Sequence, residues 1–314
     1  MKTLLLLCGL VAFLTAPLAA RTWTATDGRS LEGDYISATD TTVTFKRKDG
    51  KSFTIELTKL SADDQAFVKE QGAAASAAPD KKVDKPASPA KPVTGPWAEH
   101  ITGDWKQVEG KGGLQVMFFG DKSLDASQKW PLVVYLHGKG GNVLPKGHQG
   151  LGTICAKPDN QKERPCFILV PQCPDENGWG GGTGENFLKT LKDMTKHLPI
   201  DEDRIYLSGY SMGGFGTFAF LNQEPRLFAA GIPVAGGIGT EAARNLRKIP
   251  LWIFHGEKDE VVKPDQSRTI AKALEKLRAP VKYTEFPGAG HGIIGKVESD
   301  IEVQKWLFAQ KRGK

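Results

Sequence analysis

The chain is poor in cysteine and has no long apolar run after its first twenty residues. Its 314 residues include only 4 cysteines, and three of them, Cys155, Cys166 and Cys173, lie beyond residue 20. These three can form at most one disulfide, and the sequence does not choose the pair. Their spacing matches no zinc signature. A disulfide-rich scaffold is therefore excluded, and we expect no metal site.

Two other signals are absent: a nucleotide-binding glycine pattern and a strong imbalance of charge. The glycines follow neither G-x-G-x-x-G nor G-x-x-x-x-G-K-[ST]. The formal net charge is +6, dispersed along the chain apart from a basic end at 311–314. A dispersed charge of this size does not favour a nucleic-acid partner. We expect no nucleic acid and no cofactor.

The first twenty residues have the three zones of a secretory signal peptide. Lys2 stands before apolar runs at 4–7 and 11–14, and small residues precede Ala20. This order is typical of an export signal, and the apolar part is too short to span a bilayer comfortably. We expect cleavage near Ala20, export to the periplasm or the outside of the cell, and no stable membrane insertion.

Residues 21–70 have the pattern of a small all-β unit. Short alternating segments at 22–25, 31–36, 41–45 and 53–57 are separated by Asp-Gly turns, and a helix at 61–69 begins with Ser61 as its cap. This predicts a barrel-like domain or a meander. The runs 21–24, 49–51 and 57–65 resemble a small SH3-like homology domain first named for an actin-cytoskeleton adaptor. No group of residues in this segment could do chemistry, so we expect an accessory module that binds an unknown protein or glycan, with a plain structural appendage as the alternative.

Composition changes twice in the rest of the chain. Residues 71–97 are rich in alanine, proline and lysine, which predicts a linker. From 98 to 314, strands alternate with amphipathic helices, which predicts an α/β domain with a mostly parallel sheet flanked by helices. We expect strands at 113–119, 131–136, 167–170, from 204 onward, and at 229–233, 250–254 and 281–286, with helices at 184–197, 212–222, 265–277 and 299–310. This order resembles the α/β-hydrolase fold.

A candidate nucleophile lies where the strand from 204 meets the next helix. Gly209-Tyr210-Ser211-Met212-Gly213 fits G-x-S-x-G, a turn so tight that a side chain at either glycine would collide. Such a turn exposes Ser211 Oγ at the carboxyl edge of the sheet and places the Met212 N–H at a helix N-terminus. The alternative is a glycine-rich turn without chemistry. The predicted strand and helix around it favour the nucleophile elbow.

An acid and a base follow the serine in the chain order of α/β-hydrolases. His291, flanked by glycines beyond the last predicted strand, is the only histidine after the candidate acids. Those candidates are Glu257, Asp259 and Glu260. The run 255–262 resembles the family's H-G-x-x-D-x-x-V, which implies Asp259 as the carboxylate that orients His291.

The resemblance also assigns the surroundings of the serine. His137-Gly138-Lys139 matches the family's H-G-x, so we expect the Lys139 N–H to join that of Met212 in an oxyanion hole. His137 and His255, both at strand ends, are expected to be structural hydrogen-bonding residues. Candidate substrate contacts are Gly138, Gly140, Trp179 and Tyr210.

These parts predict acyl transfer through a serine. About sixteen residues separate the strands ending at 233 and beginning at 250, too few for a large cap, so we expect an open cleft that takes short acyl or aryl esters on small or polymeric alcohols. The catalytic part resembles exported esterases, including feruloyl and acetylxylan esterases, and predicted peptidases near the prolyl oligopeptidases. A peptidase of that kind, or an inactive binding or adhesion protein, remains the alternative. Ser211 stands where dienelactone hydrolases carry cysteine, which counts against that subfamily.

Overall fold

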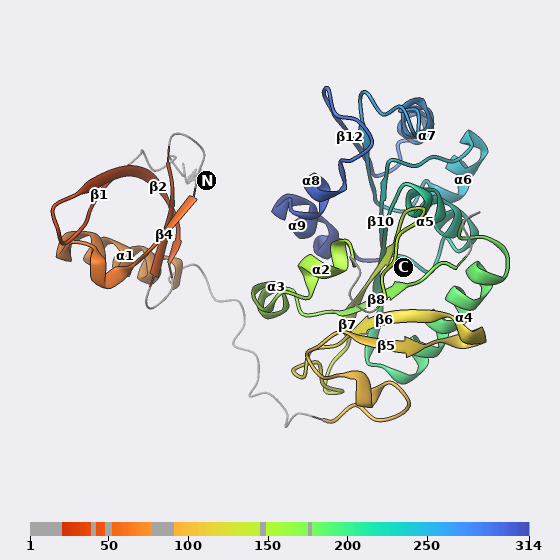
Figure 1. Ribbon diagram of the computed structural model, residues 1–314, viewed down its shortest axis with the longest axis horizontal. Coiled ribbons are helices and arrows are strands. Elements are labelled where there is room, and N and C mark those ends of the chain that lie inside the picture. Colours follow the sequence, from red (N-terminus) through yellow and green to blue (C-terminus); the bar gives the residue numbers. More distant parts are fainter. Residues whose placement is uncertain are drawn as a thin grey trace, which may run out of the picture. The chain divides into compact units, whose positions relative to one another are not determined.

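The computed structural model describes residues 21–38, 42–47, 52–76, 91–144, 149–174 and 178–313. The chain divides into two compact units, Met1–Pro86 and Ala87–Lys314 (Figure 1). The expected signal peptide at 1–20, the Asp-Gly turn at 49–50 and the expected linker from 77 to 90 lie outside the described residues.

The first unit is an antiparallel meander of four strands followed by a helix. The strands β1 (Arg21–Thr24), β2 (Ser30–Ala38), β3 (Thr42–Lys46) and β4 (Ser52–Glu56) lie in the order of the sequence. The short 3-10 helix η1 (Leu57–Lys59) leads into α1 (Ala62–Ser76). Within the described residues no ladder joins β1 to β4. The predicted meander is therefore confirmed, whereas a closed barrel and the SH3-like assignment stay predictions.

The helix α1 begins at the expected cap and ends later than expected. The Ser61 hydroxyl accepts the Asp64 N–H at 3.2 Å and donates to the Asp64 carboxylate at 2.9 Å. That carboxylate also accepts the Arg21 guanidinium at 2.8 Å, which ties α1 to β1. The helix continues to Ser76, six residues into the segment predicted as linker, because alanine has the highest helix propensity.

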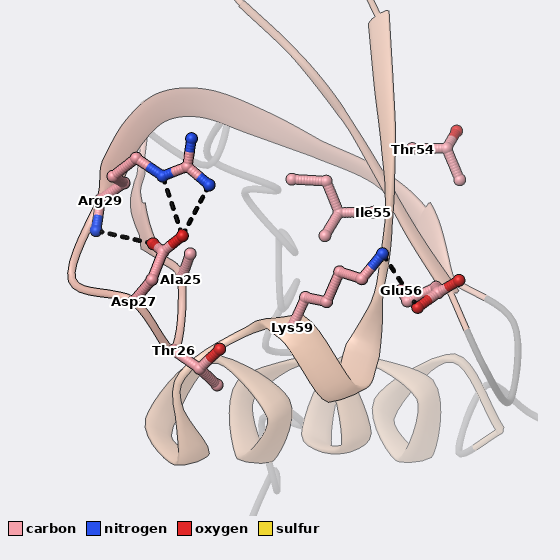
Figure 2. A pocket seen from close by; sticks show the side chains of 8 residues that line it. All are labelled: Ala25, Thr26, Asp27, Arg29, Thr54, Ile55, Glu56 and Lys59. Carbon is pink, nitrogen blue, oxygen red and sulfur yellow. Dashed lines mark hydrogen bonds and ion pairs between the residues drawn. The ribbon is translucent and has the colours of Figure 1, made fainter.

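A hollow of about 350 Å³ lies in the first unit between the turn after β1 and the strand β4 (Figure 2). Its charged groups form two exposed ion pairs, Arg29 with Asp27 at 2.6 Å and Lys59 with Glu56 at 3.2 Å. These pairs leave no nucleophile beside a base among the residues that line the hollow. A binding role for this unit stays a prediction.

The second unit contains an eight-stranded sheet in the order β12-β11-β10-β9-β7-β8-β6-β5. The six strands from β12 to β8 are parallel, and β6 and β5 are antiparallel additions at one edge. All the predicted strands are present, and β5 was not predicted because its Lys-Gln-Val-Glu segment has one apolar residue. The strands are β5 (Lys106–Glu109), β6 (Gln115–Phe119), β7 (Trp130–Leu136), β8 (Phe167–Pro171), β9 (Ile200–Tyr210), β10 (Ala230–Val234), β11 (Leu251–Gly256) and β12 (Val281–Phe286).

Helices cover both faces of this sheet, as predicted (Figure 1). Alternate residues of β7 point to opposite sides: Leu132 and Val134 join one buried cluster, and Val133 and Tyr135 the other. The first cluster includes residues of α4 (Gly181–His197), α5 (Met212–Gln223), α6 (Ala243–Leu246) and α7 (Asp265–Lys276). The second includes residues of α2 (Leu151–Cys155), α8 (Ile294–Glu298) and α9 (Ile301–Ala309). The short α3 (Pro158–Glu163) follows α2, and neither was predicted.

The predicted last helix at 299–310 is confirmed as α9, and the short helix α8 before it was not predicted. The chain forms α8 and α9 with a break at Ser299 and Asp300, because the Asp300 carboxylate accepts the Glu302 N–H at 2.9 Å and caps a new helix. The earlier α8 begins three residues after His291.

Parallel strands place their carboxyl ends at one edge of the sheet, and the predicted site residues follow four of these ends. His137 follows β7, Ser211 follows β9, Asp259 lies just after β11 and His291 after β12. The connection from β10 to β11 holds only the 3-10 helix η4 (Thr240–Ala242) and the four-residue α6. No large cap is inserted in this connection.

Candidate active site

The turn at Ser211 has the backbone of a strained elbow. Ser211 has φ 55° and ψ −115°, and its N–H donates to the Val234 carbonyl at 2.9 Å. A Cβ built on Gly213 would lie 1.9 Å from the Leu136 carbonyl oxygen, and one on Gly209 would lie 2.3 Å from the Gly213 oxygen. Both contacts are with backbone, which cannot move aside. The predicted collision at these two glycines is confirmed.

The structure brings Ser211, His291 and Asp259 together in one chain of hydrogen bonds. His291 Nε2 lies 2.9 Å from Ser211 Oγ, and His291 Nδ1 lies 2.7 Å from Asp259 Oδ2. Of the two other candidate acids, Glu260 is exposed, and Glu257 is exposed and accepts the Gly288 N–H. The geometry therefore selects Asp259 among the three, and the catalytic roles stay predictions.

Asp259 is buried, with 2% of its surface exposed, yet its surroundings favour the ionised form. Burial raises the pKa of Asp259, but the His291 bond and the N–H groups of Val262 and Val261, each 2.9 Å from Oδ1, outweigh it and hold the pKa below its ordinary value. An ionised carboxylate accepts the proton on His291 Nδ1. The opposite nitrogen, Nε2, is then unprotonated and faces the Ser211 hydroxyl.

His255 holds the loop that carries Asp259. Its ring is fully buried, and Nε2 donates to the Val262 carbonyl at 2.8 Å while lying 3.3 Å from Asp259 Oδ2. Its Nδ1 lies 2.7 Å from the Ser267 hydroxyl on α7. These contacts fit the structural role expected for His255.

Tyr210 contacts the loop of the candidate base. Its hydroxyl donates to the His291 carbonyl at 3.1 Å, and the centres of the two rings lie 5.1 Å apart. We expected a substrate contact from Tyr210. The structure places its hydroxyl on the main chain of His291, next to the imidazole, and a substrate contact from Tyr210 stays a prediction.

Trp179, which we named as a candidate substrate contact, packs inside the fold, and its role toward the substrate stays a prediction. The side chain is buried, with 4% exposed, and its indole N–H donates to the His137 carbonyl at 3.2 Å. The ring packs on α5, where a Cβ on Gly216 would lie 2.7 Å from it. The helical glycine and the loop tryptophan are 37 positions apart, so only the fold reveals that they pack together.

The loop after β7 lies beside the nucleophile. A Cβ on Gly138 would lie 3.4 Å from Ser211 Cβ and 3.3 Å from the Tyr210 ring. Lys139 and Gly140 are exposed, and Gly140 has φ 70°. Met212 is the first residue of α5, where N–H groups have no partner inside the helix. The oxyanion roles of Met212 and Lys139, and substrate contacts at Gly138 and Gly140, stay predictions.

The remaining expectations concern cysteines, metals and membranes. Cys155, Cys166 and Cys173 are buried thiols in the structure, and burial together with the neighbouring Cys155 raises the pKa of Cys166 well above its ordinary value. The described part of the chain holds no cluster of three or more potential metal-binding side chains. None of its helices combines the length and apolarity needed to cross a bilayer.

Comparison with known proteins places this geometry in a known architecture. A solved structure of a thermostable esterase is 32% identical and superposes with a TM-score of 0.61, covering 68% of this chain and 64% of the esterase. The second unit has the α/β-hydrolase fold. Residues 183–305 of this hydrolase unit match the model of the dienelactone hydrolase family.

The family match bears on the argument that Ser211 counts against dienelactone hydrolases, because the segment that matches contains Ser211. The matched segment runs from α4 into α9 and contains the elbow, the acid loop and the His291 loop.

Two curated relatives match over parts of their length. A secreted, uncharacterised protein of Arthroderma benhamiae is 27% identical over 217 residues, which cover 56% of this chain and 23% of the relative. A bifunctional acetylxylan esterase/xylanase of Neocallimastix patriciarum is 36% identical over 82 residues, which cover 26% of this chain and 12% of the relative. The chain thus spans less than a quarter of either protein.

Proposed function

We propose that the hydrolase unit is a serine esterase that cleaves carboxylic esters through an acyl-enzyme intermediate. The observation that carries this proposal is the hydrogen-bonded series from Ser211 Oγ through His291 to the buried Asp259, at 2.9 and 2.7 Å. A hydroxyl becomes a nucleophile at neutral pH when an oriented base takes its proton.

Acylation follows from these positions. His291 Nε2 removes the hydroxyl proton as Ser211 Oγ attacks the ester carbonyl, and the imidazolium that forms is stabilised by Asp259. The N–H groups of Met212 and Lys139 stabilise the oxyanion. His291 then returns the proton to the departing alcohol, which leaves the acyl group on Ser211.

Deacylation uses the same groups. His291 removes a proton from a water molecule, which attacks the acyl-enzyme through a second oxyanion, and Ser211 regains its proton as the acid leaves. Neither half requires a metal or a cofactor.

For the substrate we propose short acyl or aryl esters, including those carried on polysaccharide. Two features support this: the short β10–β11 connection, and the exposure of Lys139 and Gly140 beside the nucleophile. The acetylxylan esterase among the relatives supports the same class. We further propose that residues 1–20 direct export and that the small first unit binds a protein or glycan.

Labelling with a fluorophosphonate probe tests the proposal directly. The wild-type protein is expected to be labelled, and Ser211→Ala is expected not to be. An unlabelled wild-type protein would favour the inactive binding protein. Rates on p-nitrophenyl acetate, methyl ferulate and a peptide anilide then test the substrate, and preference for the anilide would replace the esterase with a peptidase.

A further inference from the structure

His137 is a buried histidine in the loop beside the nucleophile, and no step of the proposed reaction involves it. It follows β7 directly, and 4% of its surface is exposed. Its Nδ1 lies 2.7 Å from the Gly138 carbonyl oxygen, and its Nε2 lies 2.9 Å from the Cys173 backbone nitrogen. Both ring nitrogens therefore face backbone groups whose hydrogen-bonding sense is known.

These two neighbours determine the tautomer. A backbone N–H only donates, so His137 Nε2 accepts from Cys173 and carries no proton. A carbonyl only accepts, so Nδ1 carries the proton and donates it to Gly138. Burial lowers the pKa of His137, against the effect of the Gly138 bond, which keeps the ring neutral.

The side chain of Gln172 is consistent with this assignment. Its Oε1 accepts the Val143 N–H at 2.9 Å, so its amide nitrogen faces the other way, where it donates to the Gly141 carbonyl at 3.0 Å. The same nitrogen lies 3.2 Å from His137 Nε2. A second donor on that side again requires an unprotonated Nε2.

The carbonyl that His137 binds belongs to the peptide unit whose N–H is the expected oxyanion donor. Gly138 contributes the C=O of this unit and Lys139 the N–H, and the bond is trans. In a planar trans unit the two groups point in opposite directions. The Gly138 oxygen is held from one side by His137 Nδ1 and by the Gly141 N–H at 3.0 Å. Holding the oxygen therefore aims the Lys139 N–H away from both donors.

We propose that His137, as its Nδ1–H tautomer, is a positioning residue that aims the Lys139 N–H into the oxyanion hole. The inference rests on the proposed esterase function. The three residues after β7 then have separate roles. His137 orients a peptide unit, Gly138 leaves room beside Ser211, and Lys139 supplies the backbone donor.

Two substitutions test the two hydrogen bonds of the His137 ring separately. His137→Asn keeps an N–H near the position of Nδ1, and His137→Gln keeps an acceptor near the position of Nε2. With p-nitrophenyl acetate we expect H137N to retain kcat within about fivefold and H137Q to lose about 10- to 100-fold, below the roughly 10²- to 10³-fold cost of deleting one oxyanion donor. KM should change less than about threefold, because acylation and deacylation both pass through an oxyanion and slow together.

His197→Gln is the matched control. His197 also places Nδ1 on a backbone carbonyl, that of Asp193 at 2.9 Å, but on α4 and outside the catalytic machinery. Its kcat and KM are expected to equal those of the wild type. Equal losses of kcat in H137N and H137Q would overturn the proposal.

A double-mutant cycle with Lys139→Pro, which removes the donor itself, tests the coupling. If His137 acts through this N–H, H137Q costs little further kcat in the K139P background; additive losses would overturn the proposal. Should K139P not fold, the comparison of H137N with H137Q still tests the proposal, because it does not require that variant.

Nitrogen-15 NMR of the wild-type histidines gives a readout independent of activity. A proton on Nδ1 of His137 is expected, and a proton on Nε2 would overturn the inference. Failure of the esterase proposal looks different, because the wild-type protein would then neither react with the fluorophosphonate nor turn over esters, while the tautomer remained measurable.

Discussion

Replacing Asp259 by asparagine should leave the site assembled but give His291 the wrong tautomer. The Val261 and Val262 N–H groups both donate to Oδ1, so the amide oxygen of the new side chain must face them. Its NH₂ group then points at His291 Nδ1, 2.7 Å away in the native protein. Two donors cannot face each other, so His291 shifts its proton to Nε2 and can no longer accept one from Ser211.

The magnitude follows from this loss of the base. We expect kcat on p-nitrophenyl acetate to fall about 10⁴-fold, as in triads where the same exchange imposes the wrong tautomer. Ser211→Ala should cost more, about 10⁶-fold, because it removes the nucleophile itself. Both rates are measured at pH 7.5 together with Tm.

Glu260→Gln is the matched control, since it removes a charge from the exposed neighbouring position. Its kcat should stay within about twofold of the wild type. An Asp259→Asn protein that folds normally and keeps kcat within tenfold of the wild type would refute the reasoning. An equal loss of kcat in E260Q would also refute it, because the cause would then be the electrostatic field of the acid loop and not the tautomer of His291.

The lowered pKa of Asp259 also predicts a pH dependence of stability. A carboxylate whose pKa is lower in the folded state stabilises that state above its unfolded value, about 3.9, and this contribution is lost as pH falls through the folded pKa. The difference in unfolding free energy between wild type and D259N should therefore shrink below pH 4. Urea titrations at pH 3 and pH 7 measure it, and an unchanged difference would contradict the assignment.

Three further changes test the packing around the site. Gly213→Ala should destabilise the protein by roughly 1–3 kcal/mol or more and lower kcat about 10²-fold by displacing the elbow. Gly182→Ala, with open space at its Cβ on α4, should instead stabilise the protein by about 0.5–1 kcal/mol. Comparable Tm values for the two variants would contradict this. Tyr210→Phe removes the hydroxyl bond to His291 and should lower kcat roughly three- to tenfold, about the worth of one hydrogen bond; steady-state rates check it, and an unchanged kcat would show that the bond does not position the base. Burial raises the pKa of Glu298 to about 8, so wild-type stability should fall as pH rises from about 4.5 to 8, and Glu298→Gln should abolish that slope in urea titrations at pH 5 and pH 8.

The sequence by itself determined the order of the strands, the elbow and the candidate catalytic residues along the chain. The elbow could be predicted from the local G-x-S-x-G pattern, although only the collision at Gly209 arises within the turn, whereas the one at Gly213 is with Leu136 on β7. The parallel strands could be predicted from their apolar runs, and the position of His291 from the strand before it. These are local steric and periodic effects, legible over a few consecutive residues. The weak edge strand β5 and the five-residue helix α8 were missed because their local signals are slight.

Only the tertiary structure decided what the surrounding side chains do. Trp179 became a buried support of His137, and Tyr210 a support of the His291 loop, through hydrogen bonds that join residues 42 and 81 positions apart. The resemblance of 255–262 to the family pattern had already implied Asp259, and the distances to His291 and to two backbone N–H groups supply the physical reason. Burial and the direction of a hydrogen bond depend on which segments meet in space, and a linear pattern does not carry that information.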